Sequence, residues 1–247
     1  MFPIRDHNPS STVPVVTYAL IAANVLVFLA VWPLFNDSHA LMAFYADWAL
    51  MPARISRGEA LHGMVTYMFL HGGLMHIAGN MLFLWIFGDN LEDVFGHIGF
   101  LAFYLTTGIV AALVQYVAAP YSTVPMVGAS GAIAGVMGGY LLLFPRAQVD
   151  VLIVIIFIVR ILPLPAWAML GVWFGFQLIG GFGDNAVAGG VAHWAHVGGF
   201  STGLVLTLPV WLWRGGPRFW RSTAGTPPNA PVRYRIGRTH IPTIKRR

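Results

Sequence analysis

The feature that most limits how this chain can fold is a series of long apolar segments separated by short polar ones. A helix needs about 20 mostly apolar residues to cross the hydrocarbon core of a bilayer. Segments that meet or approach this length lie at about 14–35, 73–91, 98–118, 128–144, 164–182 and 189–211. Only 9% of the residues are charged, against about 25% in soluble domains. The sequence therefore predicts an all-α membrane protein with six transmembrane helices.

The segments between these helices predict how the chain is organised. Residues 36–71 mix aromatic, apolar and charged side chains, which is typical of a loop lying in the bilayer interface. Residues 149–162 are very apolar and β-branched but short for a crossing, so we expect them to lie along the membrane or dip into it. The chain divides into a short N-terminus at 1–12, a six-helix core at 13–212 and a basic, flexible tail at 213–247.

The distribution of basic residues predicts the orientation of the chain. Nine of the 14 Lys and Arg residues lie from Arg214 onward. Because cytoplasmic loops are enriched in Lys and Arg, we expect the tail in the cytoplasm, and with six crossings the N-terminus as well. Arg54 and Arg57 then lie on the outer side, against this rule. The basic tail is explained by this orientation without a nucleic-acid partner, and its contact with anionic lipid is a further hypothesis.

The start of the chain gives an expectation for its location. We expect the first apolar segment to be an uncleaved helix, and we find no Arg-rich, Ser-rich transit peptide before it. These features favour a bacterial plasma membrane. The chain contains no cysteine, which excludes a thiol nucleophile, a disulfide and a cysteine metal site.

Four polar side chains fall at similar depths in the predicted helices, where polar groups are costly and often functional. His76 and Asn80 are four residues apart, so they share one face of the second helix. Ser130 lies at the start of the fourth helix and His196 near the start of the sixth. These three helices run in the same direction, and each side chain lies within about 10 Å of its helix start. The sequence thus predicts one polar layer near the outer surface.

Glycines next to two of these residues predict a close helix contact. Pairs of glycines four residues apart follow both Ser130 and His196, namely Gly131 with Gly135 and Gly199 with Gly203. Small residues at this spacing let helix backbones pack closely in lipid. We therefore expect the Ser130 hydroxyl to lie within hydrogen-bond reach of the His196 imidazole.

A serine hydroxyl beside a histidine base is the core of nucleophilic acyl transfer. The imidazole accepts the hydroxyl proton during attack and returns it to the leaving amine. The Asn80 amide, the His76 N–H and backbone N–H groups near Ser130 are candidate donors to the oxyanion. No Asp or Glu lies in this layer, so the sequence predicts a Ser–His dyad rather than a triad.

Three segments, in this order on alternate helices, together resemble the rhomboid intramembrane serine proteases: HGGLMHIAGNMLFLWIFGDNLED, GASGAIAG and AHVGGFSTG. The resemblance covers about residues 13–212. It implies that Ser130 is the nucleophile of a G-x-S-G motif and that His196, in A-H-x-G-G, is the general base. His76 and Asn80, in H-x-x-x-N, together with Gly128, would then support the oxyanion.

The same resemblance implies a substrate class and a fold. The family cleaves transmembrane helices of other membrane proteins, here expected to be single-pass proteins, and needs no metal or cofactor. Its fifth helix and the following loop are thought to form a lateral gate and cap. Some relatives carry an aromatic residue one turn after the serine. Ala134 stands there in this chain, which leaves the support of the His196 ring open.

Structural explanations compete with these catalytic ones. Ser130 could be a packing residue, His196 a satisfied core histidine, and Asn80 a hydrogen-bonding link between helices. Several aromatic residues of the fifth helix are expected to face lipid or to pack: Trp167, Trp173, Phe174 and Phe176.

Other functions are also compatible with intramembrane histidines. His193 with His71, His76 and His196 suggests a metal site, but no carboxylate or thiol completes it, so no metal is predicted. A transporter or channel could use the histidines as a relay. A non-catalytic relative that binds and escorts membrane proteins is the third possibility.

Overall fold

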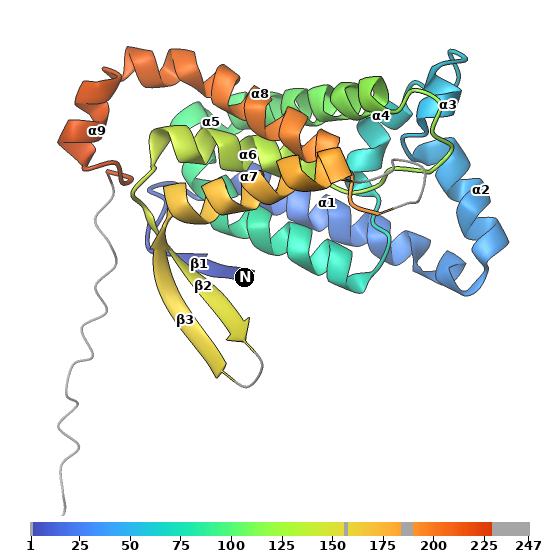
Figure 1. The fold of residues 1–247 in the computed structure, drawn as a ribbon, viewed down its shortest axis with the longest axis horizontal. Coiled ribbons are helices and arrows are strands. Elements are labelled where there is room, and N and C mark those ends of the chain that lie inside the picture. Colours follow the sequence, from blue (N-terminus) through green and yellow to red (C-terminus); the bar gives the residue numbers. More distant parts are fainter. Residues whose placement is uncertain (1, 156–157, 184–189, 229–247) are drawn as a thin grey trace, which may run out of the picture.

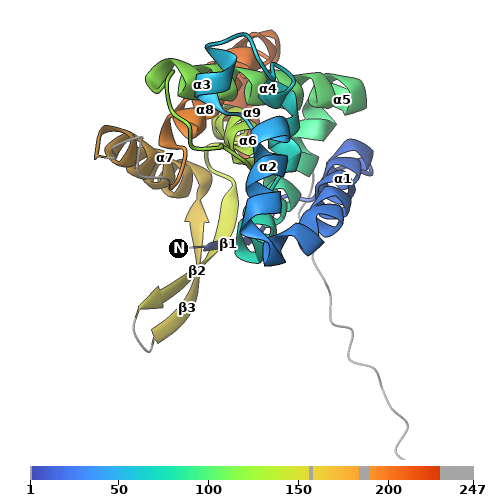
Figure 2. The same cartoon turned by 90° about the vertical axis from the view of Figure 1, so that its right-hand side faces the viewer.

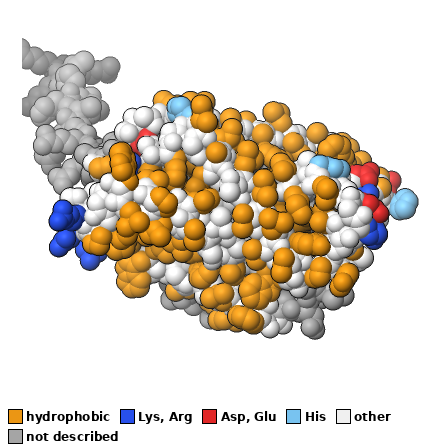
Figure 3. Space-filling view, turned by 90° about the horizontal axis from the view of Figure 1, so that it is seen from above, with side chains coloured by type: hydrophobic (Ala, Val, Ile, Leu, Met, Phe, Trp, Pro, Cys, Tyr) orange, Lys and Arg blue, Asp and Glu red, His pale blue; other side chains and the backbone are white. Residues whose placement is uncertain are grey.

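The computed structural model describes residues 2–155, 158–183 and 190–228, and it is mostly helical. The long helices run side by side, and a small sheet leaves them at one end (Figure 1). Within the described residues, four helical stretches are long and apolar enough to cross a membrane. They are α1 (Val15–Val31) with the 3₁₀ turn η1 (Trp32–Asn36), α5 (Leu74–Ala118), α7 (Ala166–Gly183) and α8 (His193–Trp213). On the face seen in Figure 3, hydrophobic side chains are spread over the middle of the molecule, and charged ones gather near its two ends.

α5 covers both the second and the third predicted helices. The short polar segment expected to separate them stays helical as far as Gly96, whose backbone (φ 69°, ψ 168°) is not helical. Glycine adopts a positive φ at little cost, so α5 is two helices joined by a kink at this residue. Glu92, just before the kink, is buried and accepts hydrogen bonds from the Val16 and Thr17 backbone N–H groups at 2.8 Å. This carboxylate caps α1 and fastens it to the kink.

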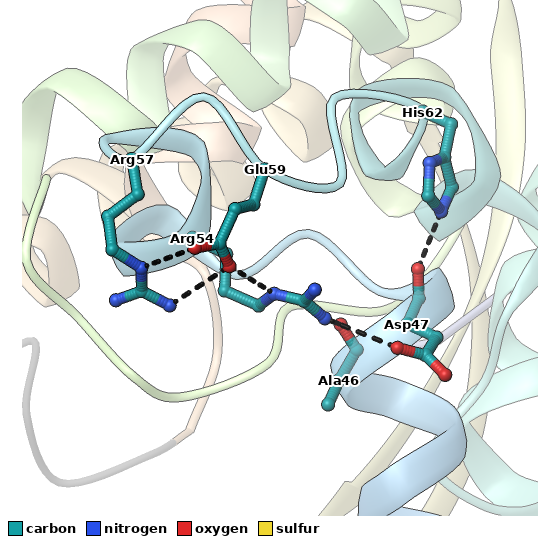
Figure 4. Close-up of polar contacts among 6 residues, drawn as sticks. All are labelled: Ala46, Asp47, Arg54, Arg57, Glu59 and His62. Carbon is teal, nitrogen blue, oxygen red and sulfur yellow. Dashed lines mark hydrogen bonds and ion pairs between the residues drawn. The ribbon is translucent and has the colours of Figure 1, made fainter.

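The predicted interfacial loop contains several short helices. They are α2 (Ser38–Trp48), α3 (Pro52–Ile55), α4 (Gly63–Thr66) and the 3₁₀ turn η2 (Tyr67–Phe69). Figure 4 shows the polar contacts that hold this segment together. Arg54 Nε lies 3.1 Å from Glu59 Oε2, and Arg54 Nη1 lies 3.3 Å from Asp47 Oδ1. Arg57 Nε lies 2.9 Å from Glu59 Oε1. Two carboxylates therefore compensate both arginines locally.

α6 (Ser130–Leu143) is the central helix of the bundle (Figure 2). It is apolar but has only 14 residues, about 20 Å of helix, and every residue from 131 to 140 is buried. A Cβ built on Gly199 of α8 would lie 2.0 Å from the Gly131 carbonyl oxygen, and one on Gly203 would lie 1.9 Å from that of Gly135. No side chain fits at these positions, so the close glycine packing predicted from the sequence is confirmed.

Two segments that were not predicted as strands, the N-terminus and the segment around 149–162, form a three-stranded antiparallel sheet. Its strands are β1 (Phe2–Asp6), β2 (Gln148–Ile155) and β3 (Ile158–Pro165), in the order β1-β2-β3. In register, Phe2 lies opposite Leu152, and Leu152 lies opposite Ile161. Segment 149–162, expected to lie along the membrane or dip into it because it is short for a crossing, instead forms most of β2 and β3, and its β-branched residues suit strands. Its partner, however, is the N-terminus, and that pairing was invisible in the local pattern.

Polar contacts fix the N-terminal strand to β2. The buried Asp150 carboxylate lies 2.7 Å from Arg5 Nε and 2.8 Å from His7 Nε2. Burial alone would raise the pKa of Asp150, but the hydrogen bonds from His7 and Arg5 together hold it below its ordinary value.

The first part of the predicted tail is folded onto the core. α9 (Pro217–Thr223) lies beside the end of α6, where Trp220 Nε1 donates to the Leu142 carbonyl at 2.8 Å. The Arg146 N–H donates to the Gly225 carbonyl at 2.9 Å. The structure therefore departs from a free tail starting at residue 213. The rest of that predicted tail, residues 229–247, lies outside the described residues.

Candidate active site

Ser130 is the first residue of α6, directly after a sharp turn of the backbone. Gly128 holds φ at +127°, which favours glycine, and its N–H donates to the Tyr67 carbonyl at 3.0 Å. The first N–H groups of a helix have no partner within the helix and carry partial positive charge. The serine therefore stands at an end of α6 that can stabilise negative charge.

His196 of α8 meets this serine. Its Nε2 lies 2.7 Å from Ser130 Oγ, although the two residues are 66 positions apart, and the imidazole is 8% exposed. The first turn of α8 is fixed by Gln115 of α5, whose Oε1 accepts a hydrogen bond from the Ala195 N–H at 3.1 Å. The glycine contacts between α6 and α8 permit the approach of the two side chains.

His76 lies against the turn before Ser130. A Cβ built on Gly128 would lie 2.7 Å from His76 Nε2 and 3.6 Å from Ser130 Oγ, so both polar atoms border the same small space. His76 Nδ1 accepts a hydrogen bond from the Gly72 N–H at 3.3 Å. In the neutral ring the proton is then on Nε2, which makes that atom a donor toward this space.

Asn80 lies one turn after His76 and is buried. Its Nδ2 donates to the His76 carbonyl at 3.0 Å, within its own helix. This bond is one that a structural asparagine would also make. His71 packs beside His76, with ring centroids 5.1 Å apart.

Two residues of α7, neither of them predicted to belong to the site, complete the surroundings of His196. Gln177 Oε1 lies 2.8 Å from His196 Nδ1 and 2.9 Å from His193 Nδ1. The Trp173 ring lies 5.6 Å from the His196 ring, centroid to centroid. This tryptophan from another helix supplies the aromatic contact that Ala134 cannot.

The aromatic residues of α7 divide into two groups. Trp173 and Phe174 pack inward, and Phe174 stacks on Phe200 at 4.5 Å between centroids. Trp167 and Phe176 are exposed, at 59% and 62%. A signal for Gln177 was present in the sequence: it carries the one side-chain amide in the apolar segment AWAMLGVWFGFQLIGGFG. The reasoning that selected Asn80 applies equally to it.

The described residues around the site include no set of metal ligands. Within residues 2–155, 158–183 and 190–228, no group of three or more His, Asp or Glu side chains is arranged to hold a metal ion. His193 and His196 instead share the Gln177 oxygen.

Comparison with protein-family models matches residues 58–213 to the Rhomboid domain. The chain belongs to the rhomboid family. This confirms the resemblance based on the three motifs, and with its apolar helices it identifies a multi-pass membrane protein. The matched range includes the four predicted polar residues and Gln177.

Named relatives support the family assignment. Rhomboid protease GluP of Bacillus subtilis is 36% identical over 130 residues, which are 52% of this chain and 24% of the relative. Rhomboid-like protein 11, chloroplastic, of Arabidopsis thaliana is 34% identical over 157 residues, 62% of this chain and 52% of the relative. Rhomboid protein 1, mitochondrial, of Saccharomyces cerevisiae is 29% identical over 201 residues, 76% of this chain and 51% of the relative. The chain thus spans about half the length of these relatives or less.

Proposed function

We propose that this rhomboid is an intramembrane serine endopeptidase that cleaves peptide bonds in or near the transmembrane segments of membrane proteins. Ser130 is the nucleophile and His196 the general base. The observation that carries the proposal is the 2.7 Å contact between Ser130 Oγ and His196 Nε2 inside a membrane protein of this family. A relative named as a protease adds support.

The proposed reaction proceeds through an acyl-enzyme. Ser130 Oγ attacks the substrate carbonyl carbon while its proton passes to His196 Nε2. The imidazolium then gives this proton to the leaving amine nitrogen as the peptide bond breaks. Water, deprotonated by the same imidazole, attacks the ester carbonyl. The imidazolium then returns the proton to Ser130 Oγ as the ester bond breaks, which releases the acid and restores the free enzyme. No metal or cofactor takes part.

The oxyanion of each tetrahedral intermediate needs donors beside Ser130. His76 Nε2–H and the backbone N–H groups at the start of α6 border the space next to Gly128 and are the proposed donors. Asn80 holds the His76 turn of α5 through the 3.0 Å bond to the His76 carbonyl, and its second amide proton is a further candidate donor.

We propose six crossings: α1, the two halves of α5 on either side of Gly96, α6, α7 and α8. α6 spans about 20 Å, less than the roughly 30 Å hydrocarbon core, so an N-terminal end below the outer surface gives water a short path to Ser130. Six crossings leave both termini in the cytoplasm. The ion pairs of Arg54 and Arg57 with acidic neighbours are consistent with an outer position for these arginines.

The proposed substrates are single-pass membrane proteins, which reach the site from the lipid bilayer. The proposed location is a bacterial plasma membrane, although relatives of this chain are named as mitochondrial and chloroplastic. The division into a short N-terminus at 1–12, a core at 13–212 and a basic tail from 213 is part of the same proposal, with the first part of the tail, α9, packed against the end of α6.

Labelling with a fluorophosphonate probe in detergent tests the nucleophile. The wild-type protein should be labelled, Ser130→Ala should not, and Ser201→Ala, which changes an exposed serine on α8, should label like the wild type. Equal labelling of Ser130→Ala and wild type would remove Ser130 from the mechanism.

Cleavage of a single-span substrate in liposomes tests the base. His196→Gln should abolish cleavage while its thermal unfolding stays close to that of the wild type. A wild-type protein that binds the substrate but never cleaves it would favour the non-catalytic alternative.

A further inference from the structure

One carboxamide on α7 contacts both histidines of α8. Gln177 is 7% exposed, its Oε1 lies 2.8 Å from His196 Nδ1 and 2.9 Å from His193 Nδ1, and its Nε2 lies 3.4 Å from the Trp173 carbonyl oxygen. This amide orientation is assigned from the hydrogen-bond network, and it pairs every group with a complementary one. The flipped amide would point its oxygen at the Trp173 carbonyl.

The accepting oxygen decides which nitrogen of His196 carries the proton. Because Oε1 can only accept, His196 Nδ1 must donate, and the neutral ring then has its lone pair on Nε2. Nε2 is the atom 2.7 Å from Ser130 Oγ, so it can accept the hydroxyl proton. In the opposite tautomer, Nε2 would carry a proton and could not act as the base.

We infer that Gln177 is a positioning residue that holds His196 in the tautomer and orientation needed for general-base catalysis. The inference rests on the proposed function of Ser130 and His196. Trp173 packs on the same imidazole, so two contacts of the base come from α7. α7 lies at the edge of the bundle (Figure 2), and its outer side chains Trp167, Phe176 and Ile179 are exposed. Displacement of this peripheral helix from α8 therefore removes the support of the base.

Three variants test the role of Gln177. Gln177→Leu keeps the size and removes the acceptor, Gln177→Glu keeps a carbonyl oxygen, and Gln148→Leu makes the same change at an exposed position of β2. ¹⁵N NMR of histidine-labelled protein, with His196→Gln for assignment, should show protonated Nδ1 in wild type, Gln177→Glu and Gln148→Leu. Gln177→Leu should shift His196 toward the Nε2–H tautomer.

Kinetics provide the second readout. Gln177→Leu should lower kcat by about ten- to a hundredfold with little change in KM, and Gln177→Glu should retain most of it. An unchanged tautomer and kcat in Gln177→Leu overturn the inference, even if wild type is labelled by the fluorophosphonate. A shifted tautomer in a protein that is never labelled instead upholds the positioning and refutes the proposed protease.

The β2–β3 hairpin exposes apolar side chains on both of its faces at Ile161 and Leu162. Residues 151–159 are all apolar in sequence. Val149 and Val151 at the base are buried, whereas Ile161 and Leu162 farther out are 53% and 43% exposed. Adjacent strand residues point to opposite faces, so both faces of the hairpin are uncovered there. The hairpin extends sideways from the bundle, near the end that carries α9 (Figures 1 and 2).

The free edge of β3 is poorly suited to pairing with another strand. The Ala166 N–H donates to the Ala147 carbonyl, so the even-numbered amides of β3 face β2 and the odd-numbered ones face outward. Pro163 and Pro165 occupy two of the outward positions and have no N–H. A second copy of the chain therefore cannot extend the sheet along this part of the edge.

We propose that the hairpin inserts into the interfacial region of the bilayer beside α7. β3 leads into α7 without a linker, so its apolar surface continues that of the exposed Trp167. Arg160 is exposed between apolar residues, where a long side chain can reach lipid phosphates. Lipid is the partner that fits these observations: the hairpin exposes apolar side chains on both faces, prolines prevent strand pairing at the edge of β3, and a cation lies nearby.

Spin labels test this proposal directly because the chain has no cysteine. Nitroxides on Ile161→Cys and Leu162→Cys in phosphatidylcholine–phosphatidylglycerol nanodiscs should be accessible to oxygen and shielded from a water-soluble nickel chelate, as on Ile179→Cys of α7. Ser222→Cys of α9 is the exposed control. Nickel accessibility equal to that of Ser222→Cys refutes lipid insertion, and so does dipolar broadening that disappears on dilution with unlabelled protein, which would indicate a second copy.

Discussion

Replacing Gly203 with alanine tests the backbone contact between α6 and α8. The new Cβ would lie 1.9 Å from the Gly135 carbonyl oxygen, whereas ordinary contacts of a Cβ begin near 3.4 Å. The helices must therefore separate by about 1.5 Å, because neither contact partner is a flexible side chain. Overpacking of this kind costs about 1–3 kcal/mol. At the upper value, a chain of this size should lose about 6–12 °C in Tm.

The same separation should disturb the active site. Gly203 lies two helical turns from His196, so a displaced α8 should lengthen the 2.7 Å contact between His196 Nε2 and Ser130 Oγ. Tryptophan fluorescence during thermal unfolding in detergent measures Tm, and the rate of fluorophosphonate labelling measures the site. Both should fall in Gly203→Ala.

Gly171→Ala is the matched control for this change. A Cβ on Gly171 of α7 meets nothing within 4 Å, and alanine is the better helix former by about 1 kcal/mol. Its Tm should equal or exceed that of the wild type. A Gly203→Ala protein with wild-type Tm, or an equal loss in both variants, would refute the account of α6–α8 packing.

Three further changes test other parts of the structure. Gly128→Ala places a Cβ 2.7 Å from His76 Nε2 at a φ of +127°, so fluorophosphonate labelling should slow by about 10²–10³-fold, and an unchanged rate would contradict the oxyanion assignment. Glu92→Gln weakens the acceptor that caps α1, so it should cost about 2 kcal/mol, or about 4–8 °C in Tm; a smaller loss than in an exposed Glu59→Gln control would oppose that role. Burial raises the pKa of Asp6 to about 6, so the folded protein holds this proton more tightly than the unfolded chain does. Stability should therefore decline as pH rises from about 4 to 6, and Asp6→Asn should reduce that decline in unfolding measurements across this range.

The sequence predicted the long helices and the four polar residues because the relevant signals are local. Apolar length sets the helices, and His76, Asn80, Ser130 and His196 stand out as polar side chains within them. The glycine pairs also predicted the contact between α6 and α8, since a position without a side chain allows another helix backbone to pack closely there. The acidic residues before Gly96 predict a polar connection between two helices, whereas the structure keeps them helical, with Glu92 buried as a cap for α1.

The sheet could not be predicted in the same way. Its β1–β2 contacts join residues about 145 positions apart, such as Arg5 and Asp150. β2 shows no clear alternation of polar and apolar residues, because Val149, Asp150 and Val151 at the hairpin base are all buried. A short, uniformly apolar segment is also typical of a segment that lies in the membrane. Only the pairing with β1 and β3 identifies β2 as a strand.

The residue that contacts His196 Nδ1 is a carboxamide rather than a carboxylate, and burial in an apolar helix gives the physical reason. In a soluble site the usual partner of a base is a carboxylate, so the absence of Asp and Glu from the polar layer indicated an unsupported dyad. At a position only 7% exposed and within an apolar helix, a carboxylate would lose its hydration, at a cost of several kcal/mol. A carboxamide oxygen accepts the same Nδ1–H bonds without a net charge, which is what Gln177 does for both His193 and His196. In membrane-embedded sites, buried Gln and Asn should therefore be examined as partners of a catalytic histidine before a dyad is inferred.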